Sequence, residues 1–260
     1  MIVPRLLLIA PLCLLLPILD FGSQLDVQAI IERSVSANEK DYEAAPLYSY
    51  KERDREAGGS NTFEVDMLDG SPYRRLIAVN NKPLSAEENK QEQQKFDNAV
   101  AHRRAETPEG RRQRIQKYES DRKRDHELMQ QLTTAFQFKL VGERKLGSFV
   151  VYLLKATPRQ GYNPPNLQTR VLTGMEGQLW IDKDTYQWVK VTAKVIRPVS
   201  IEGFLAQVEP GTRFELEKMP VGNGIWQPKH FSMKALAKVL FFFNRNSQED
   251  EIFFDYRKRP

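Results

Sequence analysis

The second half of the chain is dominated by strand-like segments that are joined by short turns. From Phe136 onward, segments such as FVVYLLKA and TRFELEKMP are separated by turn signals, among them Leu146-Gly147-Ser148 and Gly222-Asn223-Gly224. Parallel strands need crossover connections of about a dozen residues or more, and most of these connections are far shorter. The pattern therefore predicts a strongly curved antiparallel sheet, with about ten or eleven strands in the whole chain.

The clearest hairpin is GQLWIDKDTYQWVKVTAKV, residues 177–195. Strand alternation places one apolar set on a single face, namely Leu179, Ile181, Val189, Val191 and Val195. A three-residue loop at 183–185 places Trp180 opposite Trp188 on the other face. A half-buried strand needs only one apolar face, so the second must be covered by protein, a ligand or a partner. We expect the valine-rich face to lie beneath helices and the tryptophan face to lie outside; the alternative is that the tryptophans pack under the helices.

The first part of the mature chain combines helices and strands. Helical spacing of apolar residues predicts an amphipathic helix over 25–42, and strand alternation from residue 46 to 80, with a turn at Asp69-Gly70, predicts a three-stranded meander. Ser85 with Glu88 fits a capping box, and Thr107-Pro108 fits a second helix start. Two inserted helices, over 86–105 and 108–135, have few apolar residues in their middle. They are therefore expected to dock at their ends, as a lid or arm.

The N-terminus has the pattern of a secretory signal peptide. Arg5 precedes an apolar run over 6–18, and Gly22 and Ser23 follow it. We expect residues 1–23 to be removed, which leaves 24–260 as a single domain with an insertion at about 85–135, in the periplasm or secreted. The only cysteine, Cys13, lies inside the apolar run, so the mature chain has no thiol. A retained anchor and a lipidated cysteine are the alternatives.

Charge and residue types argue against several function classes. The net charge is +5, but the basic residues between 85 and 127 are interleaved with nearly as many acidic ones, which is typical of a solvated helix surface and predicts no nucleic-acid partner. Peripheral contact with anionic lipid stays open as a weaker alternative. His102, His126 and His230 have no partners at metal-ligand spacing, and no G-x-S-x-G motif is present. We therefore expect no catalytic residue, no metal and no cofactor.

The order of elements resembles that of a known family. An exported N-terminal helix, a meander, a helical insertion and a long antiparallel run that contains the G-x-L-W-I-D-x-x-T hairpin (Gly177 to Thr185) are similar to the LolA-like superfamily, which includes RseB-type proteins. The resemblance implies an α+β fold: a curved, incomplete antiparallel barrel with an apolar concave face that is covered by the N-terminal helix and the two-helix insertion. Members carry lipids or lipoproteins in that space.

The resemblance implies a non-enzymatic bacterial envelope protein that binds a lipid, an acyl chain or a lipidated protein. The expected ligand-binding residues are Leu179, Ile181, Val189, Val191, Val195, Phe231 and Met233. The alternative is a protein-interaction or envelope-stress regulatory module that uses the same sheet without a bound lipid and contacts another envelope protein. A concave face filled by its own side chains is a third reading of the same pattern.

Overall fold

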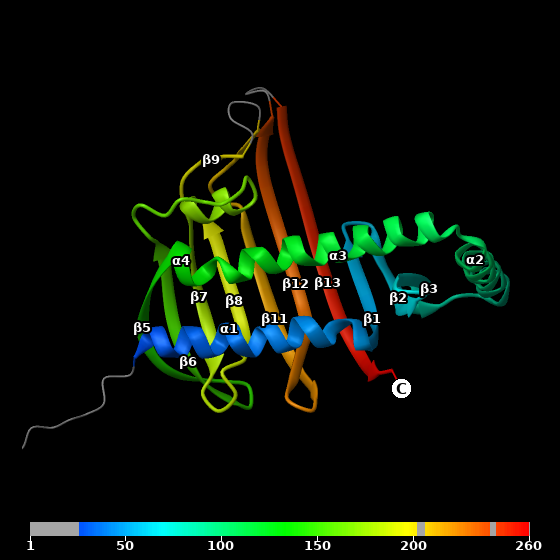
Figure 1. Ribbon diagram of the computed structural model, residues 1–260, viewed down its shortest axis with the longest axis horizontal. Helices are drawn as coiled ribbons and strands as arrows, with labels where there is room; N and C mark the ends of the chain where they lie inside the picture. Colours follow the sequence, from blue (N-terminus) through cyan, green and yellow to red (C-terminus); the bar gives the residue numbers. More distant parts are fainter. Residues whose placement is uncertain (1–25, 202–205, 240–242, 260) are drawn as a thin grey trace, which may run out of the picture.

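The computed structural model describes residues 26–201, 206–239 and 243–259, so the expected signal peptide and Cys13 lie outside the described residues. Thirteen antiparallel strands form one open sheet, and two long helices cross one of its faces (Figure 1). The predicted α+β class with an incomplete antiparallel barrel is confirmed. No helix in the described part of the chain is both long and apolar enough to cross a membrane.

The elements follow one another in a simple order. The α-helices are α1 (Val27–Ala44), α2 (Ala86–Ala105), α3 (Pro108–Gln130) and α4 (Leu132–Ala135), and the short 3-10 helices are η1 (Ala45–Leu47) and η2 (Thr169–Gly174). The first strands are β1 (Tyr48–Glu56), β2 (Gly59–Leu68), β3 (Ser71–Val79), β4 (Lys82–Pro83), β5 (Phe136–Leu146) and β6 (Phe149–Pro158). The remaining strands are β7 (Met175–Asp182), β8 (Trp188–Val195), β9 (Val199–Ser200), β10 (Ala206–Val208), β11 (Arg213–Gly222), β12 (Ile225–Val239) and β13 (Phe243–Lys258).

The C-terminal strand joins the two halves of the sheet. The strand order is β4-β3-β2-β1-β13-β12-β11-β8-β7-β6-β5; in addition, β10 pairs with β12, and β9 pairs with β10. β13 pairs with β1 on one side and β12 on the other, so the N-terminal meander and the later strands share one surface only through this last strand. The edges β4 and β5 do not pair with each other, which leaves the barrel open.

The helix starts follow the local sequence signals. The amide of Glu88 donates to the Ser85 hydroxyl at 3.3 Å, and the Glu88 carboxylate accepts from the Ser85 amide at 2.8 Å, so the predicted capping box is confirmed. Thr107 caps α3 by accepting from the Gly110 amide at 3.1 Å. The helix expected over 108–135 is interrupted at residue 131, where α3 ends and α4 begins.

The helical insertion docks on the turn between β2 and β3. The Arg103 guanidinium donates to the backbone carbonyl of Ser71 at 2.9 Å, and the Arg114 guanidinium donates to the Ser71 hydroxyl at 2.7 Å. Gly70 has φ of +93°, and a Cβ there would lie 2.8 Å from Ile115 Cδ1. The turn needs a glycine for both reasons, and α2 with the start of α3 lies at this end of the sheet (Figure 1).

The last strands differ from the sequence prediction. The sequence predicts about ten or eleven strands, whereas the described residues form thirteen. The last two are long: β12 runs without interruption from Ile225 to Val239, and it pairs with β13 from His230 onward. Residues 240–242 lie outside the described residues.

Candidate functional site

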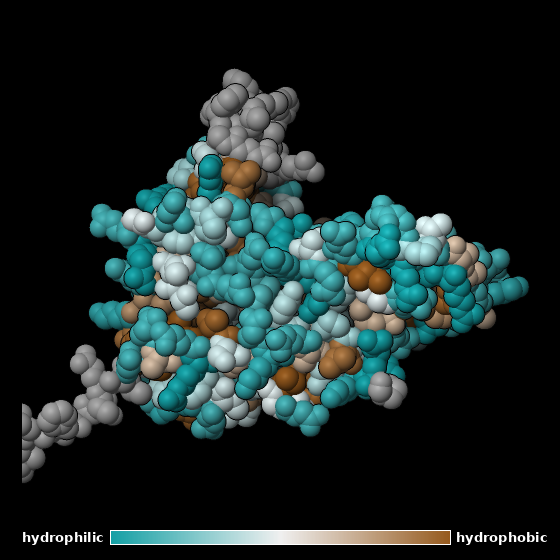
Figure 2. All heavy atoms as spheres, in the orientation of Figure 1, coloured by the Kyte–Doolittle hydropathy of each residue, from teal (hydrophilic) through white to brown (hydrophobic). Residues whose placement is uncertain are grey.

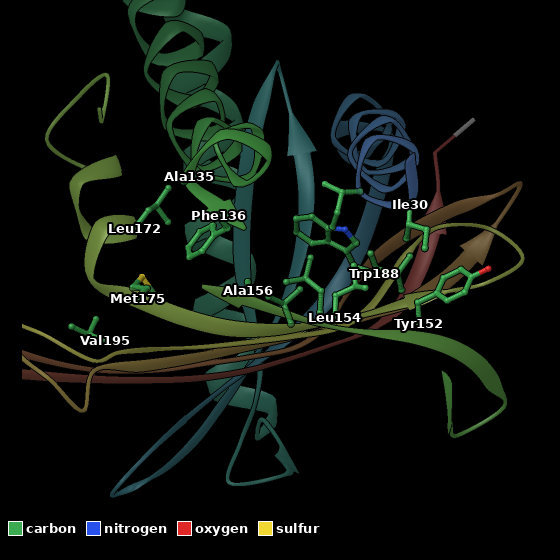
Figure 3. Packing of buried hydrophobic residues seen from close by; sticks show 14 of the residues in the cluster. Ile30, Ala135, Phe136, Tyr152, Leu154, Ala156, Leu172, Met175, Trp188 and Val195 are labelled. Carbon is green, nitrogen blue, oxygen red and sulfur yellow. The ribbon is translucent and has the colours of Figure 1, made fainter. Parts of the chain in front are cut away.

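The structure places most of the expected ligand-binding residues in the main core of the protein. Leu179, Ile181, Val191 and Val195 are 0 to 5% exposed and belong to one cluster with Ile30 and Ile31 of α1. Figure 3 shows Val195 and Leu154 on the sheet beneath the helices that carry Ile30 and Ala135. Phe231 and Met233 pair with Leu216 and Phe214, which pack against the same cluster, so they lie on the same face and are half-buried.

Trp188 and Val189 lie differently from the prediction. The ladder pairs Trp180 with Lys190 and Ile181 with Trp188, so the extra residue Val189 forms a β-bulge. Trp188 is 2% exposed and joins the helix-side cluster, whereas Val189 packs with Val151 and Trp226 in a separate, smaller cluster. The turn also has five residues instead of three, with Tyr186 at a φ of 59° and the Asp182 carboxylate accepting from the Thr185 amide at 3.0 Å.

A hollow of about 430 Å³ lies beside this core, between α1, α3 and the strands near β13. Its apolar lining is drawn from elements far apart in the sequence, and includes Tyr42, Tyr48, Tyr50, Val65, Met67, Tyr118, Met129, Leu216, Phe253 and Tyr256. The size falls within the range of small-ligand sites. We call this space the tyrosine hollow. Its lining includes none of the seven expected ligand-binding residues.

The aromatic wall of the tyrosine hollow is built by β1 and β13. Tyr50 lies with its ring centroid 5.9 Å from that of Phe253 and 5.3 Å from that of Tyr256. Phe253 and Tyr256 are three residues apart, which would put them on opposite faces of a regular strand. A register shift between the two strands, with Asp255 at a φ of 54°, allows both rings to contact Tyr50. Burial raises the pKa of the Tyr50 and Tyr256 hydroxyls, so both are neutral at physiological pH.

A buried polar network fixes α1 to the sheet at one side of the hollow. Lys218 of β11 forms an ion pair with Asp41 and donates to Asn38 at 2.7 Å. The Asp41 carboxylate also accepts from the Trp226 amide at 2.9 Å and from Gln187 at 3.1 Å. Burial lowers the pKa of Lys218 and raises that of Asp41, and their mutual attraction and hydrogen bonds oppose both shifts. Most polar atoms of this network therefore have a hydrogen-bond partner within it.

Helix α3 covers the hollow, and we call it the roof. Polar contacts hold it to α1. Among the α3 side chains that the structure describes, only His126 is buried; its ring stacks on Tyr42 at 4.0 Å and its Nε2 lies 2.7 Å from the Glu39 carboxylate. The Arg122 guanidinium lies 4.4 Å from the centre of the Tyr42 ring and donates to the Tyr42 carbonyl at 2.6 Å. The outward face of this helix is mainly hydrophilic (Figure 2), whereas its inward side contributes Tyr118 and Met129 to the hollow. Separation of the roof from α1 therefore breaks polar contacts and also exposes these two side chains.

Acidic side chains continue the β1 and β13 wall beyond Tyr50. Oxygens of Glu52, Asp54 and Glu251 lie within 4.8 Å of one another. Arg74 contacts Glu52 and Asp54, each at 2.7 Å. Burial raises the pKa of Glu52 to about 8, and Arg74 opposes this shift. The raised pKa of Glu52 and the Arg74 guanidinium both reduce the repulsion among these carboxylates.

The sequence signal for the hollow was present but weak. Tyr48 and Tyr50 alternate with Ser49 in β1, which puts two aromatic rings on one strand face. Nothing local in the sequence connects them with Tyr118 of the insertion or with β13, about 200 residues later. The strand order that brings them together is a long-range property of the fold.

No protein-family model and no curated protein matches the sequence. Solved structures to which the chain is similar include a DUF1329 family protein from Desulfovibrio piger (11% identity, 89% of this chain and 92% of that chain, TM-score 0.34). They also include a putative outer membrane lipoprotein-sorting protein domain from Vibrio parahaemolyticus (10%, 87% and 92%, TM-score 0.31) and a LolA superfamily protein from Nitrosomonas europaea (10%, 90% and 93%, TM-score 0.32).

Proposed function

We propose that this protein is a non-enzymatic carrier that binds an acyl chain, as a lipid or as part of a lipidated protein, in the tyrosine hollow. The observation that carries the proposal is the hollow itself: a space of about 430 Å³ lined by tyrosine, methionine and leucine side chains and roofed by a polar helix. Such a lining suits an apolar ligand, because its phenol rings offer apolar surface and remain uncharged.

Burial of an acyl chain of common length would contribute a large favourable free energy to binding. Transfer of a 16-carbon chain from water contributes on the order of 12 kcal/mol before costs, at about 0.8 kcal/mol for each methylene group. Losses of translational freedom and of the roof contacts subtract from this value. Opening the α3 roof breaks the His126 and Arg122 contacts with α1 and exposes the half-buried Tyr118 and Met129.

The proposed setting is the bacterial envelope, after export and removal of residues 1–23, with 24–260 acting as one domain. Four of the ligand-binding residues proposed from the sequence, Leu179, Ile181, Val191 and Val195, lie in the core against which Leu216 of the hollow packs, and Phe231 pairs with Leu216 in the ladder. The runner-up is a module in which the same sheet binds another envelope protein without lipid.

The test is a binding titration with a fluorescent hexadecanoyl probe. Leu216→Trp adds an indole inside the hollow and is expected to weaken probe binding at least tenfold. Val150→Trp adds the same group at a side chain that is 50% exposed and away from the hollow, and it should leave binding unchanged. Equal binding by both variants and the wild type would contradict the proposal, and a wild type that binds no acyl probe would favour the protein-interaction module.

A further inference from the structure

The face of the sheet opposite the helices is charged, and its ion pairs are unevenly distributed. In one part of this face the charges neutralise one another. Lys190 lies 2.6 Å from Glu215 and 3.3 Å from Glu217, and Asp250 lies 2.8 Å from both Arg55 and His230. Cross-strand pairs of opposite charge are what a solvated sheet face requires.

Elsewhere on the same face, cations stand directly opposite cations. Arg213 of β11 pairs in the ladder with Lys194 on one side and with Lys234 on the other. Lys139 and Lys155 are likewise directly opposite on β5 and β6. Like charges in these positions are about 5 Å apart at the backbone and destabilise the pairing.

Most of these cations have no acidic partner. Lys194 contacts Glu176 at 3.0 Å. Within the described ranges, no carboxylate lies within ion-pair distance of Lys155, Arg213 or Lys234. In contrast to the neutralised part of the face, these three cations are available to bind an anionic group of another molecule.

The same side chains line a groove of about 800 Å³. Its floor offers neutral hydrogen-bonding groups from Gln178, Thr192 and Ser232, which lie in register between Lys155 and Asp250. Three lining carboxylates are already paired: Glu176 with Lys194, Glu215 with Lys190, and Asp250 with Arg55 and His230. The fourth, Glu249, pairs in the ladder with Met233 and so belongs to the apolar face, which leaves the unpaired charge of the groove positive.

The dimensions of the groove favour a polypeptide over a small anion or a bilayer. The row from Lys155 to Asp250 crosses six adjacent strands, about 24 Å at about 4.8 Å between strands. An extended segment of about seven residues spans that length. A single phosphate would use one end of it, and a flat bilayer does not enter a groove.

We propose that this groove binds an extended acidic segment of a partner protein, with Lys155, Arg213 and Lys234 contacting its carboxylates. The site lies on the opposite face of the sheet from the tyrosine hollow, and its test does not depend on lipid binding.

The probe is a fluorescent eight-residue peptide of alternating Glu and Gly, titrated by anisotropy into the mature protein. Arg213→Glu with Lys234→Glu should weaken binding at least tenfold, and the neutral pair Arg213→Gln with Lys234→Gln should weaken it by a smaller factor. Lys82→Glu with Lys145→Glu makes the same change in net charge at exposed positions outside the groove lining and should stay within twofold of the wild type. Circular dichroism confirms that each variant is folded.

Two results would overturn the proposal. One is an equal loss of peptide binding in the groove pair and the control pair, because net charge alone would then explain it. The other is a wild type that ignores the peptide but binds vesicles containing phosphatidylserine in a manner that depends on Arg213 and Lys234, because the groove would then serve a membrane surface.

Discussion

Replacing Lys218 by methionine should cost this protein a large part of its stability. Lys218 is 7% exposed and Asp41 is 4% exposed, and their ion pair links α1 to β11. Removal of the ammonium leaves the Asp41 carboxylate buried with only the Trp226 amide and Gln187 as donors. Removal of one partner of a buried pair typically costs about 3–5 kcal/mol, and we expect a loss of that size in the free energy of unfolding.

A double-mutant cycle measured by urea unfolding isolates the pair. Asp41→Leu alone should be similarly destabilising. The double variant, Lys218→Met with Asp41→Leu, should lose much less free energy of unfolding than the sum of the two single losses, because no unpaired charge remains. In Asp41→Leu the lone Lys218 has a pKa lowered by burial, so the unfolded state binds more protons and stability should rise with pH.

An exposed pair provides the control. Lys183 lies 2.6 Å from Glu143 at the surface, and Lys183→Met should leave the free energy of unfolding nearly unchanged. If Lys218→Met were no more destabilising than Lys183→Met, or if the two single losses simply added, the reasoning about a buried network would be refuted.

Three further predictions concern other parts of the fold. Burial raises the pKa of Glu52 from 4.5 to about 8, so the folded state binds more protons than the unfolded state between these two values. Stability should therefore fall as pH rises from about 4.5 to about 8 and level off above it, and Glu52→Gln should flatten this dependence in thermal unfolding measured from pH 5 to 9. Ser85→Ala removes the capping box of α2 and should cost about 1 kcal/mol in urea unfolding, whereas Ser120→Ala, within α3, should cost less. His126→Ala removes the Tyr42 stack and the Glu39 hydrogen bond, and should raise amide exchange in α3 at least tenfold with little change in the sheet; uniform exchange rates would contradict a separable roof.

The sequence allowed the local features to be predicted well. The caps at Ser85 and Thr107 depend on side chains three residues from the amides they bind, and both form as expected. The antiparallel sheet follows from connections too short for crossovers. The inserted helices dock through Arg103, near the end of α2, and Arg114, near the start of α3, as their low apolar content indicates.

Features that depend on irregular or distant pairing could not be predicted. A single β-bulge at Val189 turns Trp188 towards the helices. The alternation of apolar and polar residues along a strand does not reveal where such an extra residue is inserted. The tyrosine hollow combines Tyr42, Tyr50, Tyr118 and Phe253, which lie on four elements whose neighbours are set by the position of β13. The sequence pattern identifies the apolar strands, but it does not show which of their residues line the tyrosine hollow.

The central claim, that the tyrosine hollow holds an acyl chain, is tested most directly by what the protein carries. The mature wild type and Leu216→Trp would be purified from the same cells without detergent, extracted with organic solvent and compared by mass spectrometry. The account predicts a stoichiometric acyl-bearing lipid with the wild type and its loss from Leu216→Trp. A wild type without lipid, or equal lipid in both proteins, would contradict it.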